Sequence, residues 1–439
     1  MKKLINFFVI ALLIFILAAC NKPGQTETTT KEEDSGIKGK EAVTEEIVPE
    51  EGAELIVWGN GDKEGEWIKY VAEQYSKQFE VPVKFEEVGH TDAPGKLQID
   101  GPAGLGGDVF MTASDHVGNM NSSGLLYTNY YASEYKDRFF EGANVGVSAL
   151  DEEGELQMYG YPIAVETLAM VYNKDLLDKM NFKPAETMDE LIAQSKEFMS
   201  QNPGTYGFML EPGNFYGNYS FLGGYGGYIF GDNNTNPDDI GLNNEGVVKT
   251  GKLLERIRDE ILPLKKEDLT GDVISSYFNE GKSLYTIEGS WGVNSRIDAG
   301  INLGVMVMPK LDNGEKPTPF LGVKALYVNA YSKYPKAATL FAKFATSDEM
   351  LLKRFDLTGE LPPSKDMLEN EKIKSDELKL PFLEQAQYAE PMPNIPEMQS
   401  VWGGMEVALA AIWNEDAEPK EALDIGVNQI KDAIATQSK

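Results

Sequence analysis

Cysteine is almost absent from this chain of 439 residues, because Cys20 is the only one. A single thiol cannot form a disulfide within the chain, and it cannot supply the sulfur ligands of a structural zinc site. The two histidines, His90 and His116, stand alone, and neither an HExxH nor a GxSxG motif occurs. We therefore predict a fold that rests on its hydrophobic core, with no catalytic residues, no metal and no cofactor.

Positive charge is also scarce, since 40 lysines and arginines face 70 aspartates and glutamates, which gives a formal net charge of −30. Such an acidic surface repels nucleic acid and anionic lipid headgroups. The sequence therefore predicts no nucleic-acid partner, and it predicts that contact with a membrane is made through an attached lipid alone.

No apolar run is long enough to span a bilayer comfortably. The longest runs from Leu4 to Ala19 and is interrupted only by Asn6, whereas a spanning helix needs about 20 apolar residues. Lysines precede this run, and small residues precede Cys20, which is the pattern of a secretion signal in residues 1–19. The sequence LAAC, residues 17–20, resembles the bacterial lipoprotein box, which implies that a lipid is attached to Cys20.

The segment after the cysteine, residues 20–51, is polar, low in aromatic residues and without periodicity. Such a composition predicts a flexible tether. About 390 residues then remain to fold, which exceeds an ordinary single core, so two lobes are expected.

Apolar periodicity in the folded part alternates between the strand and the helix pattern. ELIVWGN at 54–60 predicts a strand, and the apolar stripe that begins at Trp67 predicts a helix whose tryptophan is a core residue. Thr187 and Glu190 predict a capping box. Further strands are expected at 81–88, 106–113, 284–288, 301–308 and 323–330, and helices at 245–262, 336–346 and 396–414. Alternating strands and helices, beginning with a βαβ unit, favour an α/β fold.

The stretch YGYPIAVETLAMVYNK at 159–174 places one carboxylate, Glu166, inside an apolar run that reads as a strand covered on both faces. A charge in an apolar interior costs several kcal/mol unless an oppositely charged or hydrogen-bonding group is paired with it. Either Glu166 has a permanent partner within the protein, or its partner is a ligand. We favour the ligand.

Carboxylates and aromatic residues recur together at the predicted ends of strands and helices. Carboxylates and amides form hydrogen bonds with adjacent hydroxyl groups, while flat rings cover the apolar face of a pyranose. This mixture is typical of a sugar site. Each member also has an ordinary interpretation, such as a helix cap for Asp62 or Asp115, a solvated turn for Glu211 or a core position for Trp291.

The chain resembles the maltose and maltodextrin-binding lipoproteins of ABC importers, a branch of the extracellular solute-binding proteins. The resemblance runs from about Glu54 to near the C-terminus and rests on VWGNGDK, SGLL, YPIAVETLAMVYNKDLL, FNEGKSLYTIEGSW and MPNIPEMQSVW. It implies a two-lobed, type II periplasmic-binding-protein-like fold with a ligand cleft at the hinge. The implied lobes are 52–164 with 325–367, and 165–324 with 368–439.

The same resemblance implies a monomer that performs no chemistry, captures a maltodextrin-class oligosaccharide and delivers it to permease subunits driven by an ATPase. The implied sugar-binding residues are Asn60, Asp62, Lys63, Asp115, Glu166, Glu211, Phe215, Tyr216, Trp291 and Trp402.

Three positions depart from the family pattern, namely Thr112, His116 and Glu406, so the preferred sugar does not follow from the resemblance. Two other functions fit some of the same residues. Glycoside hydrolysis also uses carboxylates in a cleft, and a surface adhesin would use an exposed aromatic platform without a closing cleft.

Overall fold

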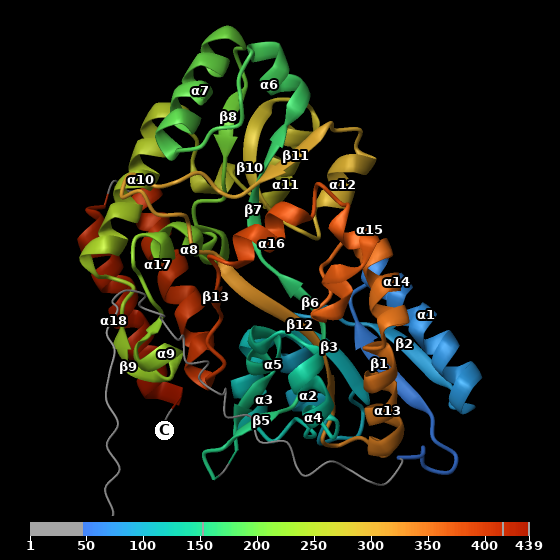
Figure 1. Cartoon of the computed structure of the whole chain (residues 1–439). Coiled ribbons are helices and arrows are strands. Elements are labelled where there is room, and N and C mark those ends of the chain that lie inside the picture. The colour runs from blue at the N-terminus through green and yellow to red at the C-terminus, as the bar shows by residue number, and fades with distance from the viewer. Residues whose placement is uncertain (1–46, 152, 415–416, 438–439) are drawn as a thin grey trace, which may run out of the picture. The chain divides into compact units, whose positions relative to one another are not determined.

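The computed structural model describes residues 47–151, 153–414 and 417–437, so the predicted signal, Cys20 and most of the tether lie outside the described residues. Figure 1 shows the arrangement of the elements. Among the described helices, we find none that combines the length and the apolar character needed to cross a membrane.

The first sheet contains six strands, in the order β13-β12-β3-β1-β2 with β6 also paired to β12. Strand β1 (Leu55–Gly59) is parallel to β2 (Val83–Glu87) and β3 (Val109–Ala113). The helix α1 (Asp62–Phe79) connects β1 to β2, so the predicted βαβ unit is confirmed. Strand β12 (Phe320–Val328) is antiparallel to β3 and to β6 (Tyr161–Glu166), and parallel to the short β13 (Glu390–Pro391).

The second sheet has four strands in the order β11-β7-β10-β8. Strand β7 (Leu168–Asn173) is antiparallel to β10 (Ser283–Gly289) and β11 (Leu303–Met306), and β8 (Tyr206–Met209) is parallel to β10. Two short strands, β4 (Ser148–Leu150) and β5 (Leu156–Met158), pair with each other, and β9 spans Asn236–Ile240.

The predicted single strand at 159–174 is wrong, because the segment forms two strands that belong to different sheets. Strand β6 ends at Glu166 in the first sheet, and β7 begins at Leu168 in the second. Between them Thr167 is buried and donates a hydrogen bond from Oγ1 to the carbonyl of Phe320 at 3.0 Å. The chain therefore crosses from one sheet to the other directly after Glu166.

The predicted helices at 245–262 and 336–346 are confirmed as α10 (Glu245–Ile261) and α13 (Pro335–Ala345). The predicted helix at 396–414 is shorter, because a 3-10 turn with Pro396 in its first positions precedes α17 (Val401–Asn414). The remaining α-helices are α2 (Ala93–Asp100), α3 (Val117–Ser122), α4 (Ala132–Arg138), α5 (Glu141–Gly146), α6 (Lys174–Met180), α7 (Met188–Gln201), α8 (Phe215–Gly224), α9 (Gly231–Asn234), α11 (Gly271–Asn279), α12 (Val293–Asp298), α14 (Asp348–Thr358), α15 (Glu371–Lys374), α16 (Leu380–Ala386) and α18 (Pro419–Gln437).

The capping box at the start of α7 forms with one change of partner. The Thr187 side chain accepts a hydrogen bond from the backbone N–H of Glu190, as predicted. The Glu190 carboxylate accepts its bond from the N–H of Glu186 rather than from that of Thr187. Both bonds satisfy backbone donors that the helix itself leaves free.

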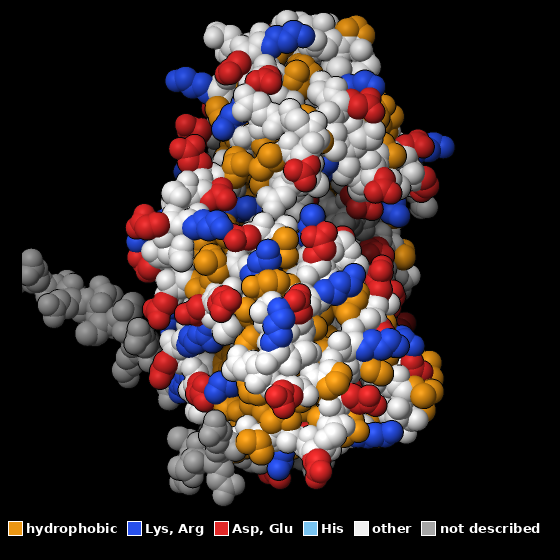
Figure 2. Space-filling view, turned by 90° about the vertical axis from the view of Figure 1, so that its right-hand side faces the viewer, with side chains coloured by type: hydrophobic (Ala, Val, Ile, Leu, Met, Phe, Trp, Pro, Cys, Tyr) orange, Lys and Arg blue, Asp and Glu red, His pale blue; other side chains and the backbone are white. Residues whose placement is uncertain are grey.

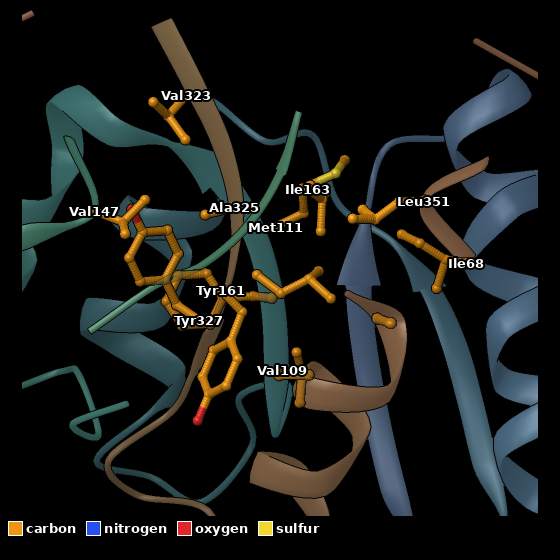
Figure 3. Close-up of a cluster of buried hydrophobic side chains, with 14 of the residues drawn as sticks. Ile68, Val109, Met111, Val147, Tyr161, Ile163, Val323, Ala325, Tyr327 and Leu351 are labelled. Atoms are coloured by element: carbon orange, nitrogen blue, oxygen red, sulfur yellow. The ribbon is translucent and has the colours of Figure 1, made fainter. Parts of the chain in front are cut away.

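Two clusters of buried apolar side chains form the core. The first surrounds the six-stranded sheet, where Met111, Ile163, Ala325 and Tyr327 pack together (Figure 3). Trp67 belongs to this cluster with 0% exposure, which confirms its predicted core position, and its ring N–H donates to the carbonyl of Met350 at 2.8 Å.

Candidate functional site

The described part of the chain contains a cavity of about 1040 Å³, which we call the cleft. Residues that follow strands of both sheets line it. Asn60 and Asp115 come after the carboxyl ends of β1 and β3, which meet at one edge because these strands are parallel. Trp291 follows β10 of the second sheet. The other lining residues are Asp62, Lys63, Glu64, His90, Thr91, Ala113, His116, Glu166, Tyr216, Asn294, Ser295, Ile297, Asp298, Lys324, Asp356, Leu357, Thr358, Glu360, Met392, Gln399 and Trp402.

The loop after β1 is held by hydrogen bonds between side chains. The Asn60 amide donates to Glu64 Oε2, and Asn60 Oδ1 accepts from the backbone N–H of His90 at 2.7 Å. Burial and the nearby Lys324 ammonium lower the pKa of His90, so the neutral imidazole is favoured. Asn60 therefore presents a fixed amide at the edge of the cleft.

Asp62 and Lys63 form the first turn of α1 at the rim of the cleft. Asp62 has a φ of 48°, and its carboxylate accepts a hydrogen bond from the N–H of Glu64 at 2.9 Å. This bond satisfies a backbone donor in the first turn of α1, and Asp62 also lines the cleft. Lys63 is exposed and forms an ion pair with Glu66 at 3.1 Å.

Asp115 lines the cleft and is buried, with 7% exposure. Its backbone carbonyl accepts a hydrogen bond from the amide of Gln399, which also lines the cleft, at 2.9 Å. Since Gln399 lies in the 3-10 turn before α17, this bond connects two segments that are 284 residues apart in sequence.

Two tryptophans present aromatic surface to the cleft. Trp291 is 38% exposed, and a methyl group at Gly289 would lie 2.3 Å from its ring, so a side chain at that position would displace the ring. Trp402 is half-buried, and its ring is in edge contact with Phe215 at 5.7 Å and Phe320 at 6.1 Å between centroids. The Trp291 ring packs against the backbone of Gly289, and the Trp402 ring packs against Phe215 and Phe320. These contacts hold both rings in place.

Two of the predicted sugar-binding residues do not reach the cleft. Phe215 is fully buried at 0% exposure beneath Trp402, so the prediction that it contacts a ligand is corrected to a supporting role. Its neighbour Tyr216 lines the cleft instead. Glu211 lines a smaller side cavity of about 190 Å³, which shares Tyr216 and Trp291 with the cleft.

Glu166 has a partner within the protein. Lys324 Nζ lies 2.9 Å from Glu166 Oε1, so the ligand is not the sole partner of this carboxylate, contrary to the interpretation that we favoured from the sequence. The same ammonium donates hydrogen bonds to Glu64 at 2.9 Å and Glu360 at 3.0 Å. Arg354 also binds Glu64 and Glu360, and these five residues form what we call the ionic cluster.

The ionic cluster shifts the pKa values of its members in opposite directions. Burial raises the pKa of Glu64. The Arg354 and Lys324 cations together lower this pKa by more than burial raises it, so they hold it well below its usual value. For Glu360, burial outweighs the same two cations and raises the pKa to about 7. For Lys324, burial lowers the pKa, but the three carboxylates hold it well above its usual value. The cluster thus keeps both cations charged and leaves Glu360 to titrate near neutrality.

We expect the titration of Glu360 to make stability depend on pH. Its pKa rises from 4.5 in the unfolded chain to about 7 in the folded chain, so the folded state binds more protons between these values. The free energy of unfolding should therefore fall as pH rises from 5 to 8. Glu360→Gln, which mimics the protonated form, should flatten that fall in urea unfolding measured across this range. An equal fall in the variant would contradict the assignment.

Sequence reasoning missed several residues of the cleft, and two of them carried a usable signal. Lys324 is a single charge inside the apolar run GVKALYV, which is the same signal that drew attention to Glu166. Glu64 lies on the helix face of Trp67, Ile68 and Val71, at helical spacing. His90, Asp298, Asp356 and Gln399 lie in loops or on helices whose spatial neighbours no local pattern reveals.

The three positions that depart from the family pattern have different settings. His116 lines the cleft. Thr112 is fully buried on β3 and donates to the carbonyl of His90 at 2.7 Å, so it does not face the cleft. Glu406 is exposed on α17 and is not among the residues that line the cleft. Within the described residues, no group of three or more histidine, cysteine, aspartate or glutamate side chains could hold a metal ion.

Comparison with known proteins gives a consistent result. Residues 70–381 match a family described as "Bacterial extracellular solute-binding protein". The galactooligosaccharide-binding protein of Bacillus subtilis (strain 168) is 33% identical over 438 residues, covering 99% of this chain and 97% of that protein. The maltooligosaccharide ABC transporter solute-binding lipoprotein of Streptococcus pneumoniae (strain ATCC BAA-255 / R6) is 30% identical over 439 residues, covering 99% and 97%.

Among solved structures, a cyclo/maltodextrin-binding protein complexed with maltotetraose has a TM-score of 0.74 at 34% identity and covers 87% of this chain and 97% of that chain. The fold is therefore the two-lobed α/β fold of type II periplasmic binding proteins, as the sequence predicted. The chain belongs to the family of bacterial extracellular solute-binding proteins.

Proposed function

We propose that this protein captures a maltodextrin-type oligosaccharide in the cleft and delivers it to the permease subunits and ATPase of an ABC importer. The observation that carries the proposal is the pair of held tryptophans, Trp291 and Trp402, which share the cleft with fixed carboxylates and amides. Rings cover the apolar faces of sugars while carboxylates accept hydrogen bonds from hydroxyl groups. The names of the relatives support the same ligand class.

The roles of the individual residues follow from their settings. Trp291, Trp402 and Tyr216 supply stacking surface, while Asn60, Asp62, Lys63, Asp115 and Glu166 supply hydrogen bonds to hydroxyl groups. Glu211 contacts only a sugar unit that extends into the adjoining side cavity.

The lobes are proposed to comprise residues 52–164 with 325–367, and residues 165–324 with 368–439. The direct passage from β6 to β7 at Thr167 supports a hinge at this point. Strand β12 supports a second hinge, because its partner changes along its length. It pairs with β13 at Phe320 and with β3 from Lys324 onward. Rotation about these short connections would close the cleft around a sugar.

The protein is proposed to be a monomer held on the outer face of the bacterial cell membrane by a lipid on Cys20. The support is the LAAC sequence after an apolar segment and the word lipoprotein in the names of relatives from Streptococcus pneumoniae. Figure 2 shows acidic and basic side chains interspersed over one face of the described residues.

Calorimetric titration with linear glucans, cyclic glucans and galactooligosaccharides tests the proposed ligand. We expect saturable binding of a linear maltodextrin at one site. Preference for a galactooligosaccharide, the ligand in the name of one relative, would correct the sugar but keep the function. Hydrolysis of the oligosaccharide during the titration would instead indicate an enzyme, the alternative in which cleft carboxylates act as acid and base.

The charge of the cleft predicts rejection of anionic sugars. Seven carboxylates line the cleft against two lysines, Lys63 and Lys324. Like charges brought together in a binding site cost several kcal/mol. Maltotetraose oxidised to a carboxylate at its reducing end should therefore bind at least about ten-fold more weakly than maltotetraose reduced to the alditol. The two ligands differ only at C1, which is a carboxylate in one and a neutral hydroxymethyl group in the other.

Salt concentration provides the control for this comparison. Ions screen the repulsion, so the difference in affinity between the two ligands should shrink when calorimetry is repeated at high salt. Equal affinities at low salt would show that the carboxylates of the cleft do not discriminate against an anionic sugar.

A further inference from the structure

Lys324 occupies the centre of the ionic cluster, and its side chain is only 7% exposed. Three carboxylates from three separate elements surround its ammonium group at 2.9 to 3.0 Å. They are Glu64 from α1, Glu166 from the end of β6 and Glu360 from the segment after α14. Because β12 and β6 are antiparallel, with Lys324 opposite Ala164 and Gly322 opposite Glu166, Lys324 and Glu166 are diagonal neighbours.

The two cations of the ionic cluster have different partners. Arg354 Nη2 binds Glu64 at 2.5 Å and also binds Glu360, and its guanidinium lies over the Trp67 ring at 4.9 Å, inside the core. Lys324 binds both of these carboxylates and also Glu166, and it lines the cleft. Lys324 is therefore the cation of the ionic cluster that lines the cleft, whereas Arg354 is not among the residues that line it.

The two oxygens of Glu166 have different environments. Oε1 is buried against Lys324 Nζ and has no hydrogen bond. The side chain as a whole is 12% exposed and lines the cleft. The ion pair therefore fixes one oxygen of a carboxylate that lines the cleft.

A second chain of contacts leads from Lys324 to the loop after β1. Lys324 donates to Glu64 Oε1, and Glu64 Oε2 accepts from the Asn60 amide. Asn60 in turn holds His90. One ammonium group thus fixes a carboxylate and an amide that come from two different strands of the sheet.

We propose that Lys324 is a positioning residue of the sugar site, which orients Glu166 directly, and Asn60 through Glu64, toward the hydroxyl groups of the ligand. Lys324 is not itself a sugar contact, because its ammonium group donates hydrogen bonds to Glu64 and Glu360 and is also paired with Glu166. This inference rests on the proposed function and adds a residue that the resemblance did not supply.

The simpler alternative is that Lys324 only neutralises buried charge. Three carboxylates face two cations, so Lys324→Met would leave one further uncompensated charge and could fail to fold. Above the pKa of Glu360, which is about 7, the variant Lys324→Met/Glu360→Gln removes one charge of each sign and keeps the balance. It also leaves Glu64 its pairing with Arg354. This variant therefore separates the effect of losing the group that positions Glu166 from the effect of leaving a buried charge unpaired.

The experiment measures maltotetraose affinity by calorimetry and thermal unfolding for the full chain. In Lys324→Met/Glu360→Gln we expect an unliganded melting temperature within a few degrees of wild type and an affinity at least about ten-fold lower, since Glu166 is no longer held. Adding Glu166→Gln to this variant should then cost much less affinity than Glu166→Gln costs in the wild-type chain. Such non-additivity shows that the lysine acts through this carboxylate, which a purely structural role would not produce.

An affinity within two-fold of wild type in Lys324→Met/Glu360→Gln would overturn the proposal. So would an effect of Glu166→Gln that is the same with and without Lys324. Wild-type protein is titrated in parallel. A wild-type chain that binds no oligosaccharide would contradict the proposed function and this inference together, whereas normal binding by wild type and variant contradicts the inference alone.

Discussion

The variant Trp291→Ala/Trp402→Ala is expected to bind maltotetraose about 30-fold to 20,000-fold more weakly than wild type. Stacking of a planar ligand on an aromatic side chain contributes roughly 1 to 3 kcal/mol per ring. The two rings come from different elements, the loop after β10 and α17, and rest on different supports, so their contributions should add. Calorimetry on the single and double variants measures the losses and their sum.

The same variant should keep its folded stability in the absence of sugar. Removing a core tryptophan costs about 3 to 5 kcal/mol of folding free energy, as expected for Trp67 at 0% exposure. Trp291 is 38% exposed, so its removal leaves no comparable cavity. Tyr331→Ala is a matched control, because Tyr331 is 44% exposed and lies away from the cleft. Normal affinity with a collapsed melting temperature in the double variant would mark the tryptophans as core residues.

The variant Cys20→Ala is expected to release the protein from membranes completely. If the thiol carries the lipid, the substitution removes the proposed attachment, and a formal net charge of −30 disfavours contact of the remaining chain with anionic lipid headgroups. Lipid attachment contributes about 0.8 kcal/mol for each buried CH₂ group, so its loss removes the whole membrane affinity. Fractionation of expressing cells, together with labelling by a radioactive fatty acid, measures the effect.

Cys20→Ser is the matched control for side-chain polarity, and it should behave like Cys20→Ala because a hydroxyl group does not replace the thiol in this modification. Unchanged labelling of either variant, or protein that stays in the membrane fraction, would show that the anchor lies elsewhere.

Local sequence patterns predicted the elements well wherever burial dictates periodicity. The apolar stripe of α1 and the apolar strands of the first sheet were predicted because residues that face the core recur with the period of the helix or the strand. The apolar pattern alone did not reveal the break at Thr167, because both flanking strands are buried and an apolar run looks the same whether it belongs to one sheet or to two. Only the resemblance, with its lobe boundary between residues 164 and 165, placed a crossing near this point.

The site was predicted only in part, because chemical type is visible in a sequence and orientation is not. Phe215 and Tyr216 are neighbours at the start of α8, yet one ring is buried and the other lines the cleft, and only the position of α8 decides between them. Glu166 was noticed as a charge in an apolar strand. Its partner Lys324 lies 158 residues further along the chain, and antiparallel pairing of β6 with β12 brings the two together.

The most direct test of the sugar-binding account is a crystal structure of the protein grown with maltotetraose. We predict electron density for the sugar in the cleft, with pyranose rings stacked on Trp291 and Trp402 and a hydroxyl group hydrogen-bonded to Glu166 Oε2. Glu166 Oε1 should remain beside Lys324. An empty cleft at a saturating sugar concentration, or sugar bound elsewhere on the chain, would contradict the account.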